Sequence, residues 1–220
     1  MSETEEVWTG FAARFGAFID MLKQESERGS VIVSAALMDE ALEQLLKAKL
    51  VPSPEKNDEL FYGPYAPLGN FSAKIDFAYR VGIIGVNQRS SMHLIRKLRN
   101  DFAHSSRQIG FTSQKVHSRI QKLFDLNKKL LDTVWNVVER ENNQHVFEMI
   151  GEQELKQGAD YLSKIMGWRA TFELLCAFVG ASFYEALDGI EPLVARNSNS
   201  MTQVKTSQVL CNESAALKVE

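Results

Sequence analysis

The stretch MHLIRKLRNDFAH, residues 92–104, decides the fold class. Its apolar residues recur at spacings of three and four, which is the period of an amphipathic α-helix. The apolar stripe is formed by Leu94, Ile95, Leu98 and Phe102. On a second side, Arg96, Asn100 and His104 stack four residues apart, with His93 one turn earlier and Arg99 flanking them. The segment predicts a helix over residues 88–103 whose end carries a basic, hydrogen-bonding ridge.

Helical periodicity continues on both sides of this stretch. The expected helices cover residues 7–23, 31–50, 71–84, 88–103, 113–134 and 168–187. No segment alternates with period two for long enough to predict a sheet, and no segment repeats. We therefore expect an all-α fold, a single multi-helix bundle over residues 1–190 with a polar, disordered tail over residues 191–220.

Several residues are expected to mark helix ends. Ser72 and Ser113 are candidate N-terminal caps of the third and fifth helices, because serine oxygens accept hydrogen bonds from the first free N–H groups. Gly85 is expected to end the third helix. Gly29 either terminates the first helix or eases a sharp entry into the second.

A long loop is expected between the second and third helices. Residues 52–70 hold four of the five prolines, together with Gly63 and Gly69. This loop also carries Phe61, Tyr62 and Tyr65. Because exposed aromatic side chains are costly, they either cover the core or contact a ligand or partner.

Composition and charge limit the function classes. The 220 residues are 45% hydrophobic and 24% charged, which suffices for a sizeable core. A net charge of −3 lacks the basic field that strong duplex DNA binding requires, so direct sequence-specific DNA binding is not expected. Cys176 and Cys211 cannot build a disulfide framework, and the acidic start resembles no secretory signal; we expect a cytoplasmic protein.

The last expected helix, residues 168–187, is apolar almost all round. Its uncharged run, residues 174–184, is too short to span a membrane, so no membrane association is expected. A helix of this kind lies in the middle of the bundle or against a second subunit. Gly180 and Ala181 would permit close backbone approach there, and we expect a homodimer.

The basic ridge is the strongest candidate site in the sequence. Arginine offers a planar fork of donors, asparagine a directional amide and histidine an exchangeable proton, so the ridge suits a phosphate or carboxylate. The alternative is structural, with the arginines paired to Asp101, Asp76 or Glu40 across the bundle. The four histidines lack the spacing of a metal site and no glycine-rich phosphate loop is present, so neither a metal nor a cofactor is expected.

Three motifs in register resemble the bacterial mannitol operon repressor family. They are ESERGSVIVSAALMDEALEQLL, LFYGPYAPLGNFSAKIDFAYRVGII and LIRKLRNDFAH. The similarity spans residues 18–131 and, more loosely, 168–187. It implies a helical regulator of transcription that represses mannitol or other sugar-utilisation genes without a DNA-binding module of its own.

A shorter pattern is similar to the motif of the HEPN superfamily of helical RNases and nucleotide-binding proteins. This is Arg99-Asn100-xxx-His104. The resemblance implies that two subunits bring Arg99 and His104 together. His104 would exchange a proton with a ribose 2′-hydroxyl, Arg99 would stabilise the phosphate and Asn100 would orient it, with no metal.

Three functions follow as alternatives. The first is a non-enzymatic regulator that acts through contacts with another, transcription-related protein. The second is a metal-independent RNase or nucleotide-binding protein that uses Arg99, Asn100 and His104. The third is a small-ligand sensor in which the aromatic loop closes over the ridge.

Overall fold

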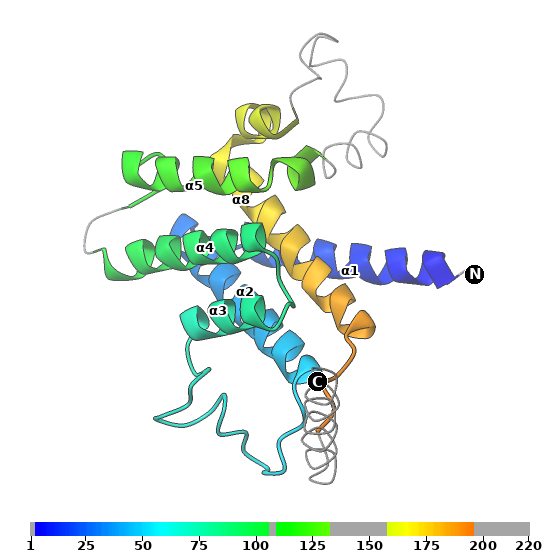
Figure 1. The fold of residues 1–220 in the computed structure, drawn as a ribbon. Coiled ribbons are helices and arrows are strands. Elements are labelled where there is room, and N and C mark those ends of the chain that lie inside the picture. The colour runs from blue at the N-terminus through cyan, green and yellow to red at the C-terminus, as the bar shows by residue number, and fades with distance from the viewer. Residues whose placement is uncertain (1–2, 106–108, 133–157, 196–220) are drawn as a thin grey trace, which may run out of the picture.

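The computed structural model describes residues 3–105, 109–132 and 158–195, and these are helical without a strand, as expected (Figure 1). The elements are α1 (Glu3–Lys23), α2 (Glu27–Lys49), α3 (Phe71–Arg80), α4 (Val86–His104), α5 (Gln114–Leu126), α8 (Gly158–Ala186) and the short 3₁₀-helix η1 (Leu187–Gly189). All six expected helices are present in the expected order. Residues 133–134, the end of the expected fifth helix, and the expected tail from residue 196 lie outside the described residues.

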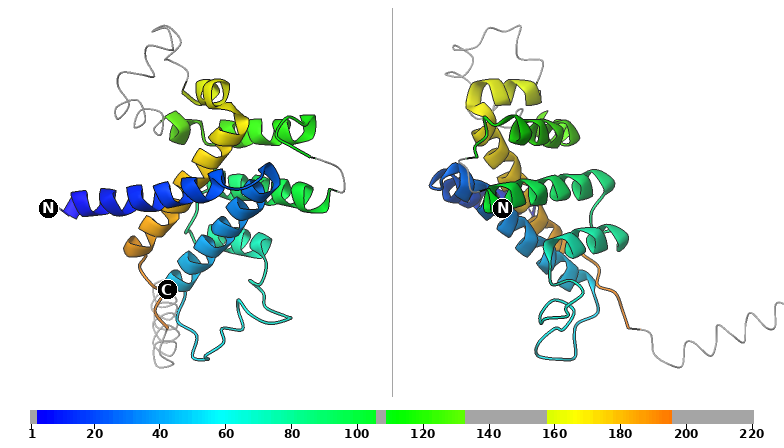
Figure 2. Two further views of the ribbon diagram at one scale, coloured as in Figure 1. Left: turned by 180° about the vertical axis from the view of Figure 1, so that it is seen from behind. Right: turned by 90° about the vertical axis from the view of Figure 1, so that its left-hand side faces the viewer.

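The helices pack in two layers. In the front layer, α3, α4 and α5 lie side by side and alternate in direction (Figure 1). Behind them, α2 crosses α3 and α4, and α8 crosses α2; α1 packs on α8 and α2, and the side view separates the layers (Figure 2). Because α2 contacts α1, α3, α4 and α8, it is the central helix of the bundle.

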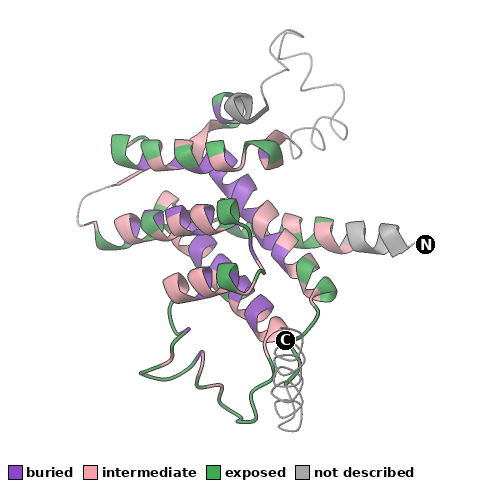
Figure 3. Ribbon diagram, viewed as in Figure 1, coloured by how far each residue is buried: buried purple, intermediate pink, exposed green. Residues whose placement is uncertain are grey.

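The core lies where the two layers meet (Figure 3). In the central helix, the apolar residues that recur at helical spacing are buried: Ala35, Met38, Leu42, Leu45 and Leu46. The predicted stripe of the fourth helix is buried as well: Leu94, Ile95, Leu98 and Phe102. Helical periodicity therefore identified the faces that lose contact with water, which is the largest favourable contribution to folding.

Side chains that were not predicted as caps accept hydrogen bonds at the starts of α2 and α3. α2 begins at Glu27 because Ser26 Oγ accepts the Gly29 N–H at 3.0 Å, so Gly29 lies in the first turn of α2 and does not end α1. α3 is capped by the Asn70 side chain, which accepts the Ala73 N–H; the prediction of Ser72 as the cap was wrong.

The turn between α3 and α4 also differs from the prediction. α3 ends at Arg80, before Gly82, whose φ of +76° turns the chain in a conformation that glycine adopts without strain. Gly85 is the N-cap residue of α4 and not the end of α3. Its N–H donates to Gln88 Oε1 at 2.7 Å, which fixes the start of the helix that carries the ridge.

The fifth helix is shorter than predicted. Asn127, with φ −112° and ψ 18°, interrupts the expected run, and its side-chain amide donates to the Leu123 carbonyl and to Ser91 Oγ. Ser113 occupies the N-cap position, but its side chain makes no capping hydrogen bond.

α8 is broken at Gly167, whose φ of +79° lies outside the helical region. The half that follows forms the core of the bundle, with Phe172, Leu175, Cys176 and Ala181 buried. A Cβ at Gly180 would lie 3.1 Å from Met38 Cε, so side chains of α1 and α2 pack closely against the α8 backbone at this glycine. The segment Met166–Gly189 meets the length and composition of a membrane span, but 61% of its apolar window is buried inside this bundle.

Candidate anion-binding site

A hollow of about 410 Å³ opens between α2, the start of α3 and α4. It is lined by Ile32, Ala35, Ala36 and Asp39 of α2, by Gly69, Asn70, Phe71 and Ser72 around the start of α3, and by Arg96, Arg99 and Asn100 of α4. Its size is within the range of small-molecule sites in proteins. Three of the five predicted ridge residues therefore line one hollow.

Arg96 and Arg99 have no carboxylate partner among the described residues. Arg96 Nε is buried and makes no hydrogen bond there, which is costly for a cationic group. Arg99 Nη1 donates to Asn100 Oδ1 at 3.0 Å, so the Asn100 oxygen is occupied and its NH₂ group remains a donor. The hollow thus presents donors of hydrogen bonds along its α4 side.

Two of the three carboxylates that the structural alternative assigned to the arginines, Asp101 and Asp76, are engaged elsewhere. Asp101 pairs with Lys115 at 2.8 Å and with Arg119, both on α5. Asp76 pairs with His93 and Arg89, and hydrogen bonds from these two residues lower the pKa of the Asp76 carboxyl. Among the described residues, neither Arg96 nor Arg99 forms the carboxylate pair that the structural alternative expected.

The predicted ridge is divided by these contacts. His93 lies against Asp76, with Nε2 3.1 Å from Oδ1, on the side that faces α3. His104 is the last residue of α4, is exposed, and is not among the residues that line the hollow. At about 100° per residue, His104 points about 140° away from Arg99, so the two side chains diverge within one chain.

The start of α3 adds further donors. Asn70 Oδ1 accepts the Ala73 N–H at 3.0 Å, and Asn70 O accepts the Lys74 N–H at 3.2 Å. The N–H groups of Phe71 and Ser72 are the two earlier donors of this first turn, which has no intrahelical partners for them. A helix start also carries a partial positive charge, so it favours an anion in the hollow.

The aromatic loop is attached to α2 by a charged network that sequence reasoning did not identify. Glu43 accepts hydrogen bonds from Lys47 at 2.7 Å, from Lys74 at 2.6 Å and from the Tyr62 hydroxyl at 2.6 Å. Lys74 is 6% exposed and also lies 2.9 Å from Asp39 Oδ1. We call these five residues the Glu43 network.

The network shifts the pKa values of its members. Burial acts to raise the pKa of Glu43, but the hydrogen bonds from Lys47, Lys74 and Tyr62 outweigh it and lower that pKa to about 2. Burial acts to lower the pKa of Lys74, but hydrogen bonds to Glu43 and Asp39 outweigh it and raise that pKa. Both groups are therefore held in their charged forms at neutral pH.

The three loop aromatics have different environments. Phe61 is 4% exposed and belongs to the core, as one of the two alternatives predicted. The Tyr62 hydroxyl is bound in the Glu43 network, whereas Tyr65 is 94% exposed. None of the three lines the hollow at Arg96; Tyr62 and Tyr65 instead line a separate hollow of about 490 Å³ within the loop.

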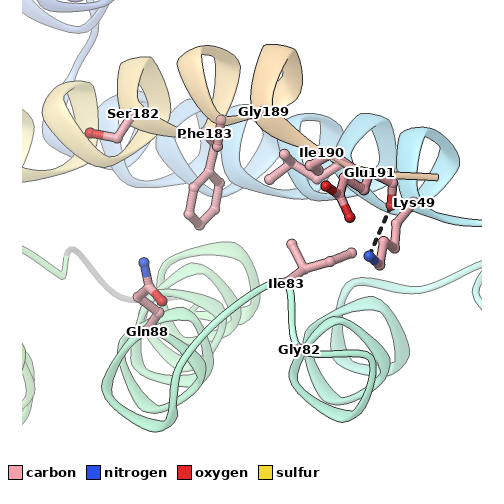
Figure 4. Close-up of a pocket in the computed structure, with 11 residues that line it drawn as sticks. Lys49, Gly82, Ile83, Gln88, Ser182, Phe183, Gly189, Ile190 and Glu191 are labelled. Carbon is pink, nitrogen blue, oxygen red and sulfur yellow. Dashed lines mark hydrogen bonds between the residues drawn. The ribbon is translucent and has the colours of Figure 1, made fainter. Parts of the chain in front are cut away.

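Another hollow, of about 390 Å³, lies between the ends of α2 and α8 and the turn before α4 (Figure 4). Its walls are of mixed polarity, with the apolar side chains of Ile83, Phe183 and Ile190 beside polar ones such as Gln88 and Ser182. Lys49 Nζ donates to the Glu191 carbonyl at 2.9 Å, and this contact holds the chain after η1 beside α2. The Lys49 ammonium group is therefore already bound to a backbone carbonyl of the same chain.

Charge is strongly segregated along the chain. Residues 86–130 contain ten Lys and Arg against two Asp, a surplus of eight positive charges, whereas the remaining residues contain fifteen against twenty-six. The basic surplus falls on α4, α5 and the segments that join and follow them, and it includes the α4 wall of the hollow. Such a field raises the local concentration of anions.

The described residues contain no group of three or more His, Cys, Asp or Glu side chains that could hold a metal ion. Cys176 is buried, and burial raises the pKa of its thiol to about 12, so it is an inert core residue.

Comparison with known proteins reveals a shared fold. No family model matches the chain, and no curated protein matches it. Among solved structures, the chain is similar to one from the X-ray structure of the MtlR–HPr complex from Escherichia coli. The TM-score is 0.50 at 16% sequence identity, and the similarity covers 79% of this chain and 99% of the other. The expected likeness to the mannitol operon repressors is thus supported at the level of the fold.

Proposed function

We propose that this protein is a non-enzymatic regulator of transcription that acts by binding another protein. The observation that carries the proposal is the fold shared with nearly the whole length of MtlR, which was solved in complex with the protein HPr. The three sequence motifs that resemble the mannitol operon repressor family point in the same direction. Genes for the use of mannitol or another sugar are therefore the proposed targets of the regulation.

The charge of the molecule is consistent with an indirect mode of action. At a net charge of −3, the whole chain lacks the field for tight, non-specific duplex binding. A helical bundle instead offers shaped faces between helices for a protein partner. A homodimer remains part of the proposal, although α8, which suggested it, buries most of its apolar residues within its own chain.

Calorimetric titration of the full chain with purified HPr tests the proposal directly. We expect saturable binding, with an unrelated protein of similar size and charge as the control. Deletion of the gene is expected to raise transcription of a sugar-utilisation operon. Absence of HPr binding together with unchanged transcription of such operons would contradict the proposal.

A second experiment tests the non-enzymatic part. Arg99 and His104 diverge within one chain, so only a second subunit would bring the two side chains to one phosphate. Because the shared fold favours a non-enzymatic regulator, we expect no RNA cleavage when the purified protein is incubated with RNA in the presence of a chelator. Cleavage that is abolished in both Arg99→Ala and His104→Ala would favour the RNase alternative instead. Analytical ultracentrifugation of the same preparation determines whether a dimer forms.

A further inference from the structure

We propose that the hollow between α2, α3 and α4 binds a small phosphate monoester that also carries hydroxyl groups. This inference is independent of any protein partner and concerns an effector site. It begins from Arg96, whose Nε is buried without a hydrogen bond among the described residues. An N–H donor buried without a partner is costly unless an acceptor satisfies it.

Phosphate fits the donors of the hollow better than a carboxylate does. Arg96, Arg99 and the Asn100 amide approach from α4, and the N–H groups of Phe71 and Ser72 lie at the start of α3. A phosphate monoester offers three terminal oxygens and about two negative charges, whereas a carboxylate offers two oxygens and one charge. Guanidinium groups and helix starts are both recurrent phosphate-binding elements.

The rest of the hollow indicates what the phosphate is attached to. Ile32, Ala35 and Ala36 form an apolar wall on α2 that suits carbon atoms. Asp39 lines the same hollow, and Lys74 Nζ lies 2.9 Å from its Oδ1. Because Lys74 holds it in place, the Asp39 carboxylate is an acceptor for a ligand hydroxyl.

Asp39 also limits the number of charges that the ligand carries. A second phosphate placed near this carboxylate would be repelled, because like charges at short range disfavour each other. The volume of about 410 Å³ admits a body of the size of a hexose. The site is therefore expected to prefer one phosphate group on a short hydroxylated carbon chain or ring over a bisphosphate.

Calorimetric titration of the full chain with glucose 6-phosphate, glycerol 3-phosphate, glucose and inorganic phosphate tests the site. We expect both esters to bind with a lower Kd than inorganic phosphate, and glucose not to bind. Arg96→Gln and Arg99→Gln are each expected to raise the Kd of the esters at least tenfold, which corresponds to the loss of about one charged hydrogen bond. Fructose 1,6-bisphosphate is expected to bind more weakly than the monoesters.

Lys97→Gln is the matched control. Lys97 lies on the same helix, is exposed and does not line the hollow, and its replacement removes the same charge. We expect the Kd of the esters to change less than twofold in this variant. Thermal melting of each variant establishes that it is folded, and Arg96→Lys, which keeps the charge but loses Nε, is expected to weaken binding as Arg96→Gln does.

The outcomes separate cleanly. Absence of binding by both esters in the wild-type protein would overturn the inference. Equal losses of ester affinity in Lys97→Gln and Arg96→Gln would also overturn the inference. They would indicate that the general positive field of α4 and α5 attracts the esters. Backbone amide shifts of Phe71 and Ser72 in NMR spectra on addition of glycerol 3-phosphate, absent with glucose, would locate the ligand at the start of α3.

Discussion

The Glu43 network and the hollow at Arg96 share Asp39, yet the cations of the two regions have different environments. In the network, Lys74 is buried and contacts both Glu43 and Asp39. In the hollow, Arg96 and Arg99 have no carboxylate partner among the residues that the structure describes. The difference separates charge that stabilises the fold from charge that remains for a ligand.

The largest expected effect is the loss of Lys74. Lys74→Ala leaves Glu43 and Asp39 close together without the cation between them, so we expect the free energy of unfolding to fall by about 3–5 kcal/mol. Urea unfolding followed by circular dichroism measures this change. Lys97→Ala, an exposed lysine outside the network, is expected to stay within about 0.5 kcal/mol of wild type. Equal losses of stability in Lys74→Ala and Lys97→Ala would mean that the Glu43 network does not stabilise the fold.

A second test uses pH. Because the pKa of Glu43 is lowered to about 2 in the folded protein, its contribution to stability is fully present above its unfolded pKa of about 4.5 and is lost as pH falls towards 2. Thermal melting from pH 6 to pH 2.5 is expected to show a loss of stability that is smaller in Glu43→Gln than in wild type. An identical pH profile in the variant would mean that other carboxylates dominate acid unfolding.

A smaller effect is expected from the loop side of the network. Tyr62→Phe removes the hydroxyl that donates to Glu43 and accepts from Lys47. We expect this loss to lower the free energy of unfolding by about 0.5–1.5 kcal/mol. Hydrogen exchange of residues 55–67 should become faster, because the loop loses a point of attachment. Tyr65→Phe is the control, since Tyr65 is 94% exposed, and it should change neither quantity.

The smallest effect is predicted for the hollow itself. Arg96→Gln without ligand is expected to change the free energy of unfolding by no more than about 0.5 kcal/mol, or to raise it slightly, because the arginine has no protein partner to lose. Urea unfolding of this variant beside Lys74→Ala measures the contrast directly. A loss above about 2 kcal/mol would place Arg96 among the residues that hold the fold together.

Much of the fold was predictable from the sequence, because burial follows helical periodicity. The faces of α2 and α4 were identified in this way, since the spacing of their apolar residues depends only on local geometry. The interruption at Asn127 and the cap at Asn70 were not predicted. Both depend on which side chain among several polar candidates reaches a free backbone group.

The site was predictable only in part. The residue types of Arg96, Arg99 and Asn100 indicated an anion site, and the structure brings these three to one hollow. The Glu43 network was missed because Glu43 and Lys74 are 31 residues apart and meet only when α2 packs against α3. His93 and His104 do not line the hollow. His93 instead contacts Asp76 of α3, and the spacing of residues within α4 alone does not predict a contact with another helix.

The break at Gly167 has a consequence for how this chain tolerates change. In an unbroken helix, adding one residue rotates everything that follows by about 100°, which would turn the buried side of α8 out of the core. The positive φ at Gly167 ends the helical register at that point, and Trp168, which stacks on Phe124 directly afterwards, starts a new one. A residue inserted or deleted before Gly167 is therefore expected to leave the packing of the helix after it unchanged.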